Sequence, residues 1–88
     1  MPSFFLKIMR IDKYLKNSRI IKRRTVAKSA CDKGLIKINE KIAKAGDEVV
    51  IGDIIEIKLG NKEILVKVLS VDDNVSKDEA SSIYERID

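Results

Sequence analysis

The sequence predicts an α+β fold in which two short N-terminal helices pack on a small, mainly antiparallel sheet, with a further helix at the C-terminus. Residues 10–35 hold apolar side chains at helical spacing, and residues 35–71 hold short β-rich runs separated by turns. An S-x-x-E pattern then precedes a last apolar stripe. With 88 residues, the chain has room for one domain with a modest core.

The first helix is predicted because apolar and basic residues fall on opposite sides of a helical wheel. At about 100° per residue, Ile8, Ile11 and Leu15 share one arc. The basic residues of the opposite arc are Arg10, Lys13 and Lys16. This helix is therefore expected to have a core face and a basic face.

A second helix is predicted to begin near Arg24 and to stop at Gly34, since glycine readily adopts the left-handed conformation that ends helices. Residues 18–22, between the two helical patterns, predict a tight helix-turn-helix corner. The apolar arc of the second helix comprises Val26, Ala27, Ala30 and Cys31.

Short runs rich in isoleucine and valine predict the strands of the sheet. They occupy residues 35–38, 42–43, 49–51, 54–59 and 64–71. The turns between them are predicted at residues 39–41, 44–48, 52–53 and 60–62. In the run 54–59, charged residues alternate with apolar ones, which indicates a strand with one solvent-facing side.

The last helix is predicted to begin at Ser76 and to continue through Ile87, because Ser76 and Glu79 form a capping-box pattern. We expect Tyr84 to pack with its hydroxyl in water, ahead of serving as a platform for a stacked base. The apolar stripe of this helix would comprise Ala80, Ile83, Tyr84 and Ile87.

Charge is divided unevenly along the chain. Residues 1–44 hold 13 basic and 3 acidic side chains and residues 45–88 hold 5 and 11, so the net charge of +4 conceals +10 and −6. This division favours a polyanionic partner such as RNA. Alternatives are lysines that only solubilise a small domain, and an adaptor for membrane surfaces or acidic proteins. The scarcity of large apolar residues on the basic face counts against membrane insertion.

We interpret the clustered basic residues as phosphate contacts, since arginine can grip two oxygens or stack on an exposed base. They are Arg10, Lys13, Lys16, Arg19, Lys22, Arg23, Arg24 and Lys28. Asp12, the only acid between residues 7 and 28, is expected to organise a neighbouring cation ahead of touching RNA itself. Asn39 is expected to serve its turn ahead of contacting a base. The cationic footprint could be widened by Lys33, Lys37, Lys41 and Lys44.

Catalysis finds no support in the sequence. Histidine is absent, and no glycine-rich phosphate loop or metal-ligand spacing occurs, so we expect no enzyme activity, cofactor or metal. The single cysteine, Cys31, is expected to be a small core residue. The sequence shows no signal peptide or membrane-spanning pattern, and we expect a cytoplasmic monomer. Met9 could be the true start, in which case residues 1–8 are an upstream mis-start, a cloning remnant or an ordered extension, and we assign them no function. Residues 9–88 are interpreted as one RNA-binding domain.

A combination of positions identifies a protein family more specifically than any single position does. It comprises Arg10, Asp12, Lys13, Leu15, Ser18, Arg19, the run 22–24, Gly34, Ile36, Ile38, Asn39 and the turn 52–53. On these positions, residues 9–59 resemble the small RNA-binding module named after the fourth ribosomal protein of the small subunit. With residues 60–88, the whole is similar to the bacterial ribosome-associated quality-control protein P family (RqcP). Glu40 departs from the pattern, because glycine usually follows the asparagine, and a glutamate tolerates positive φ less well.

The resemblance implies binding to the large ribosomal subunit, through 23S rRNA and tRNA, after a stalled ribosome has split and peptidyl-tRNA remains. It also implies cooperation with the factor that recruits alanyl-tRNA for alanine tailing. A related small heat-shock protein shares the module. Large-subunit recycling of that type, or a general rRNA-binding role in ribosome assembly, is therefore the alternative.

Overall fold

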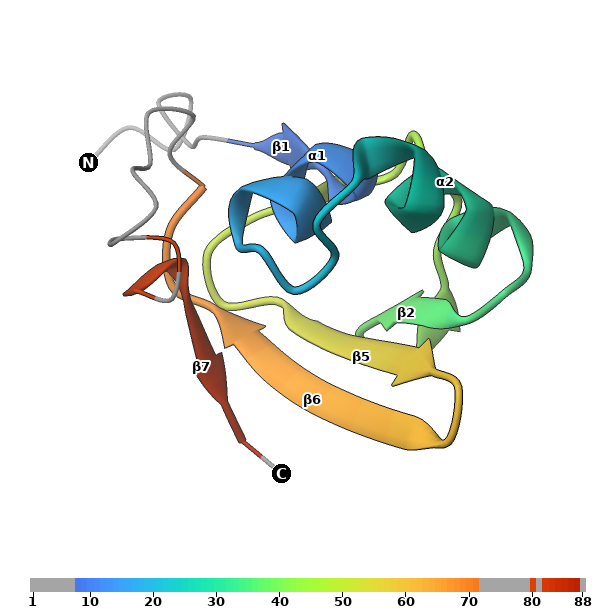
Figure 1. Ribbon diagram of the computed structural model, residues 1–88. Helices are drawn as coiled ribbons and strands as arrows, with labels where there is room; N and C mark the ends of the chain where they lie inside the picture. Colours follow the sequence, from blue (N-terminus) through green and yellow to red (C-terminus); the bar gives the residue numbers. More distant parts are fainter. Residues whose placement is uncertain (1–7, 72–79, 81, 88) are drawn as a thin grey trace.

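Figure 1 shows the computed structural model, which describes residues 8–71, 80 and 82–87. The elements in chain order are β1 (Met9–Arg10), α1 (Ile11–Asn17), α2 (Arg24–Asp32), β2 (Ile36–Ile38), β3 (Lys41–Ile42), β4 (Glu48–Val49), β5 (Ile54–Leu59), β6 (Lys62–Val68) and β7 (Tyr84–Arg86). The described strands form a five-stranded antiparallel sheet in the order β3-β2-β5-β6-β7, and β1 pairs with β4 in a separate antiparallel ladder.

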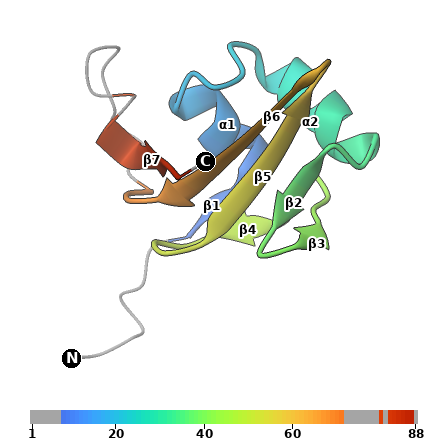
Figure 2. The ribbon, with the colours of Figure 1, turned by 90° about the horizontal axis from the view of Figure 1, so that it is seen from below.

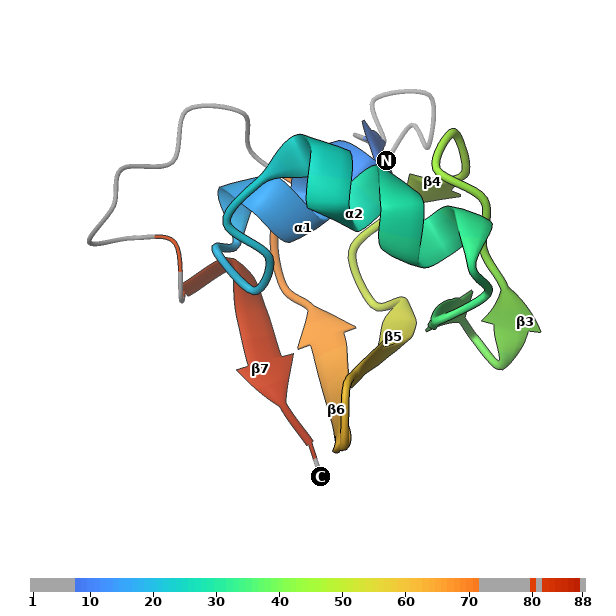
Figure 3. The same cartoon turned by 45° about the vertical axis from the view of Figure 1, so that its right-hand side comes forward.

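The described elements form two layers. α1 and α2 lie side by side over one face of the sheet, as Figures 1 and 3 show. Viewed from below, the strands β2, β5 and β6 run beneath the helices (Figure 2). Two helices on an antiparallel sheet were predicted and are confirmed, whereas the β1–β4 ladder was not predicted.

Alternation along the strands separates the two faces of the sheet, because successive side chains point to opposite sides. The residues that face the helices and are buried are Ile36, Ile55, Ile57, Val66 and Val68. On the outer face, Lys37 and Glu56 stand opposite each other in register. The predicted strand 54–59 coincides with β5, while the predicted strand 64–71 begins and ends earlier, as β6.

The core face of α1 includes Ile11 and Leu15, as predicted, and both are fully buried. The prediction for Ile8 is wrong, because the helix begins only at Ile11 and the Ile8 side chain is 53% exposed. Met9, on β1, is buried instead. Sequence periodicity alone could not show that a two-residue strand precedes the helix.

The core face of α2 is narrower than the predicted arc. Ala27, Ala30 and Cys31 are buried, but Val26 is 47% exposed, so its assignment to the core was wrong. At about 100° per residue, Val26 lies about 90° from the middle of the arc that the other three form. Small residues on this face allow α2 to lie close against α1.

The predicted C-terminal helix is wrong over the residues 84–86, which form β7 and pair with β6. The predicted cap residues Ser76 and Glu79 lie outside the described residues. Pairing with the edge of β6 gives the backbone a hydrogen-bonded ladder that a short isolated helix does not match. Ile83 is nevertheless buried, as its place in the apolar stripe predicted.

The β2–β3 hairpin turns through Asn39 and Glu40, which have φ angles of +51° and +71°. Two successive positive φ angles are typical of the tight turn that best matches the twist of a hairpin. Glu40 therefore adopts the conformation for which glycine is suited, and the turn keeps its shape with a strained residue.

Candidate nucleic-acid interface

The predicted phosphate contacts lie on the helical layer. They come from β1, α1, the loop 18–23 and α2, and they are Arg10, Lys13, Lys16, Arg19, Lys22, Arg23, Arg24 and Lys28. Lys13 is half-buried, and the others are exposed. One continuous stretch of chain, residues 10–28, thus supplies these eight cations, which are called the cationic surface below.

The loop between the helices is held by Ser18 and Ile21. The buried Ser18 hydroxyl donates to the carbonyl of Leu15 at 3.0 Å and accepts from the N–H of Ile20 at 3.4 Å. Ile21 is buried, and its N–H donates to the same Leu15 carbonyl at 3.2 Å. Between these anchors Arg19 takes a φ of +62°. The loop therefore presents its basic side chains from a defined backbone.

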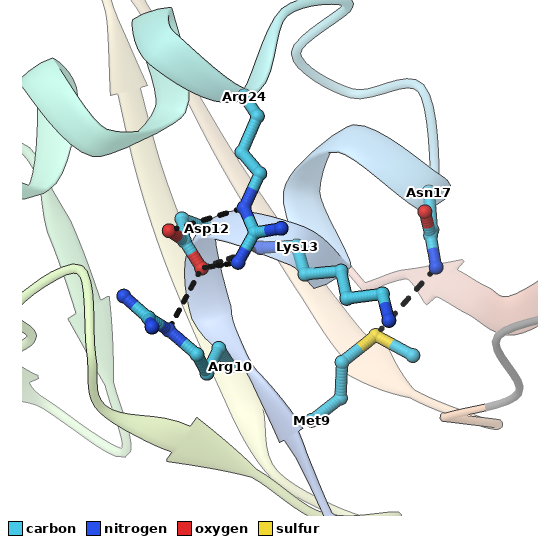
Figure 4. Close-up of polar contacts among 6 residues, drawn as sticks. All are labelled: Met9, Arg10, Asp12, Lys13, Asn17 and Arg24. Atoms are coloured by element: carbon cyan, nitrogen blue, oxygen red, sulfur yellow. Dashed lines mark hydrogen bonds and ion pairs between the residues drawn. The ribbon is translucent and has the colours of Figure 1, made fainter.

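Asp12 lies between Arg10 and Arg24 and is itself buried, with a side chain only 4% exposed. Its Oδ1 lies 3.5 Å from Nε of Arg10, and its Oδ2 lies 3.3 Å from Nε of Arg24 (Figure 4). The backbone N–H of Lys13 donates to Oδ1 at 2.8 Å. Asp12 thus pairs with neighbouring cations, as expected, and its partners are the two arginines.

Arg24 belongs to the cationic surface and also forms an ion pair that links the two helices. Its side chain is 47% exposed and so reaches solvent as predicted, while its Nε and Nη2 engage the buried Asp12. The same guanidinium connects the first turn of α2 to the first turn of α1 through Asp12 (Figure 4). Sequence reasoning missed this second role, although a lone acid among cations was a signal that it needed partners.

Asn39 lies in the turn between β2 and β3, and its side chain bonds to residues at the start of β5 instead of within its own turn. Its Nδ2 donates to Oδ1 of Asp53 at 3.1 Å, and its Oδ1 accepts from the N–H of Ile54 at 3.0 Å. Asp53 in turn accepts from the N–H of Val50 at 3.0 Å. These bonds fasten the β2–β3 hairpin to the start of β5.

The remaining lysines, which were predicted to widen the cationic footprint, lie on strands and loops outside the two helices. Lys37 lies on the outer face of the sheet, where its Nζ is 3.7 Å from Oε2 of Glu56. Lys41 is exposed on β3 at the edge of the sheet. Lys33 and Lys44 are exposed in loops. The outer face also carries a shallow pocket of about 340 Å³, lined by Asn39, Glu40, Ile54, Glu56 and Leu65, which none of the predicted phosphate contacts line.

Burial suppresses the reactivity of Cys31, as expected of a core residue. It raises the pKa of the thiol to about 11, and the nearby carboxylates of Asp12, Asp32 and Asp47 act in the same direction. In the described part of the chain, no group of three histidine, cysteine or acidic side chains is placed to hold a metal ion. Nor does any described helix combine the length and the apolar composition needed to cross a bilayer.

Comparison with known proteins matches the S4 domain family to residues 9–55. The RQC P-site tRNA stabilizing factor of Streptococcus pneumoniae is 54% identical over 79 residues, which cover 90% of each chain. The protein of the same name from Halalkalibacterium halodurans is 49% identical over 77 residues, 88% of each chain.

A solved trimeric structure of heat shock protein 15 from Vibrio cholerae aligns with a TM-score of 0.84 at 27% identity, over 92% of this chain and 83% of that one. The two-layer arrangement is thus shared with a solved relative, and the sequence match extends well beyond the helical layer. The chain belongs to the S4 domain family and, within it, to the family of the RQC P-site tRNA stabilizing factors.

Proposed function

We propose that this protein is a non-catalytic RNA-binding factor of ribosome-associated quality control in the cytoplasm. It binds the large ribosomal subunit through 23S rRNA and peptidyl-tRNA, and it supports alanine tailing together with the factor that recruits alanyl-tRNA. The observation that carries the proposal is the cationic surface of the helical layer. The name of the relatives, which refers to stabilisation of P-site tRNA, supports it.

The surface suits structured RNA because it combines two kinds of contact. The arginines of β1 and α2 offer planar groups that can engage two phosphate oxygens or stack on a base. The lysines of α1 and α2 add attraction with little directional demand. Recognition of this kind follows the shape of the RNA backbone more than its sequence.

Gradient sedimentation tests the proposal with vacant large subunits, intact ribosomes and large subunits that carry peptidyl-tRNA. We expect preferential binding to the last of these. Binding should disappear after RNase treatment, whereas an adaptor for lipids or acidic proteins would keep its partner. With about five to seven phosphate contacts, the log-log slope of affinity against salt should be on the order of −4 to −6. A flat response to salt would refute the electrostatic basis.

The second candidate is a recycling function of the heat-shock type, or a general role in ribosome assembly. The likeness to the Vibrio cholerae heat shock protein favours this candidate. Equal binding to vacant and peptidyl-tRNA-bearing large subunits would support this second candidate function. That solved relative is trimeric, whereas we propose a monomer, and sedimentation equilibrium of the isolated protein separates the two states.

A further inference from the structure

We propose that Asp12 is a positioning residue, which fixes the guanidinium groups of Arg10 and Arg24 so that the surface prefers structured RNA over an arbitrary polyanion. The inference rests on the proposed function and assigns a source for its selectivity. It has an unusual consequence, because the residue that improves recognition of a polyanion is itself negatively charged.

The first step is the geometry of the pairing. Asp12 is almost completely buried, while the side chains of Arg10 and Arg24 are 53% and 47% exposed. Each arginine thus has one part held by a buried carboxylate and another part in solvent. Because Asp12 belongs to α1, its carboxylate places both guanidinium groups relative to the same helix (Figure 4).

The second step concerns the donors that the pairing leaves over. Asp12 engages Nε of Arg10, and it engages Nε and Nη2 of Arg24. Nη1 of Arg24 and both Nη atoms of Arg10 lie outside the pairing with Asp12. A guanidinium has five N–H donors in a rigid plane, so holding one edge sets the direction of the others.

The third step is entropic. A free arginine side chain carries about 2 kcal/mol of rotamer entropy, which binding to a phosphate would otherwise remove. Arg10 and Arg24 are already restrained by folding, so less is lost when RNA binds. A flexible homopolymer can adapt to any arrangement of cations. A folded RNA has phosphates in fixed positions, so it binds more tightly to donors that already point in the right direction.

A model based on charge alone makes the opposite prediction. Asp12 lies within 3.5 Å of two cations of the surface, so its carboxylate weakens their attraction for every polyanion. Asp12→Asn would then tighten binding to all RNA. Under the positioning model, the same change weakens binding to structured RNA while binding to a homopolymer rises.

The chain offers a matched control in Asp32, an exposed acid at the end of α2. Asp32 forms no hydrogen bond or ion pair with another side chain in the described part of the molecule. Asp32→Asn removes the same charge from the same layer without touching an arginine pair. It should raise affinity for all RNA slightly.

The experiment measures the affinity of the full chain for purified large ribosomal subunits and for single-stranded poly(A), at one salt concentration of about 0.15 M. We expect Asp12→Asn to weaken binding to large subunits by about tenfold, the scale of one charge-assisted contact, and to strengthen binding to poly(A). Identical behaviour of Asp12→Asn and Asp32→Asn would overturn the inference. If the wild-type chain shows no preference for large subunits, the proposed function fails first.

A second pair of variants decides the matter should Asp12→Asn fail to fold, which thermal melting would reveal. Arg24→Lys keeps the charge but loses the planar fork, and Arg23→Lys makes the same change next to it, at a residue not paired with Asp12. We expect Arg24→Lys to lose more affinity for large subunits than for poly(A), and to lose more than Arg23→Lys. Equal losses in the two variants would contradict a role for the pairing with Asp12.

Discussion

The hydroxyl of Tyr14 donates a hydrogen bond of 2.6 Å to the carbonyl of Ile83, 69 residues further along the chain. Tyr14 is fully buried in α1, and Ile83 immediately precedes β7. The bond therefore ties the first helix of the cationic surface to the last strand of the sheet. Burial raises the pKa of Tyr14, and the proximity of Tyr84 adds to this, so the hydroxyl keeps its proton.

Tyr14→Phe should lower the free energy of unfolding by about 1 kcal/mol, the usual net value of one hydrogen bond. The loss stays modest because the Ile83 carbonyl also accepts from the N–H of Leu69 at 2.9 Å and of Ser70 at 3.1 Å. Urea denaturation measures the change. The matched control is Tyr84→Phe at a half-buried position, which should cost less than about 0.5 kcal/mol. Equal effects at the two positions would show that the buried bond contributes nothing specific.

Arg24→Ala should have two effects that separate in different assays. Large-subunit binding should weaken by about 1–3 kcal/mol, the range for a charge-assisted contact. The free energy of unfolding should also fall, by about 1–2 kcal/mol, because the buried Asp12 loses one of its partners while Arg10 remains. The sequence predicted the first effect with little change in stability, and the pairing with Asp12 alters that expectation.

Co-sedimentation and thermal melting on the same sample measure both effects of Arg24→Ala. Arg23→Ala is the control, since Arg23 is exposed and its side chain does not pair with Asp12. It should weaken binding without loss of stability. The double variant need not be additive, because both residues contribute to one local field. A folded Arg24→Ala chain that still binds normally at physiological salt would remove this surface from the interface.

Glu40→Gly should raise the free energy of unfolding by about 0.5–1 kcal/mol. A non-glycine residue at a φ of +71° is strained by about 1–2 kcal/mol, and glycine relieves this strain. The larger conformational entropy of an unfolded chain with glycine offsets part of the stabilisation. Glu40→Ala keeps the strain and should show no such gain. Chemical denaturation of the three proteins at one pH compares them, and a stabilised alanine variant would mean that the glutamate side chain, not its backbone, is unfavourable.

The Cys31 thiol should make stability depend on pH in the alkaline range. Its pKa is about 11 in the folded protein and about 8.5 in an unfolded chain, so folding favours the protonated thiol. The contribution is fully present below about pH 8.5 and is lost as the pH rises toward 11. Denaturation across this range should show a shallower decline for Cys31→Ala than for the wild type. Equal slopes would mean that the thiol titrates normally in the fold.

Strong local patterns explain why much of the fold could be predicted. The alternation at residues 54–59 reproduces β5, and the helical spacing of Ile11 and Leu15 identifies the buried face of α1. Gly34 ends the second helical segment with a φ of +74°, as its position predicted. In each case, the residues that determine the element lie within it or directly beside it.

Elements that depend on a distant partner could not be predicted in the same way. β1 and β4 are two residues long each, and only their pairing defines them. Residues 84–86 are compatible with a helical stripe, but the available edge of β6 makes them a strand. The pairing of Asp12 with Arg24, 12 residues apart, likewise requires that the two helices be packed. For the candidate nucleic-acid interface, the sequence identified the basic residues but not which of them form ion pairs with Asp12.

The bond between Tyr14 and Ile83 also bears on the order in which the protein is made. A ribosome synthesises residues 10–28 before it synthesises Ile83, which accepts the hydrogen bond from the first helix. The buried hydroxyl of Tyr14 has no acceptor from Ile83 until residue 83 has been synthesised and has emerged. The first helix of a growing chain therefore lacks this bond until the residue that immediately precedes β7 is available, so its attachment to the sheet is completed only after residue 83 has been made.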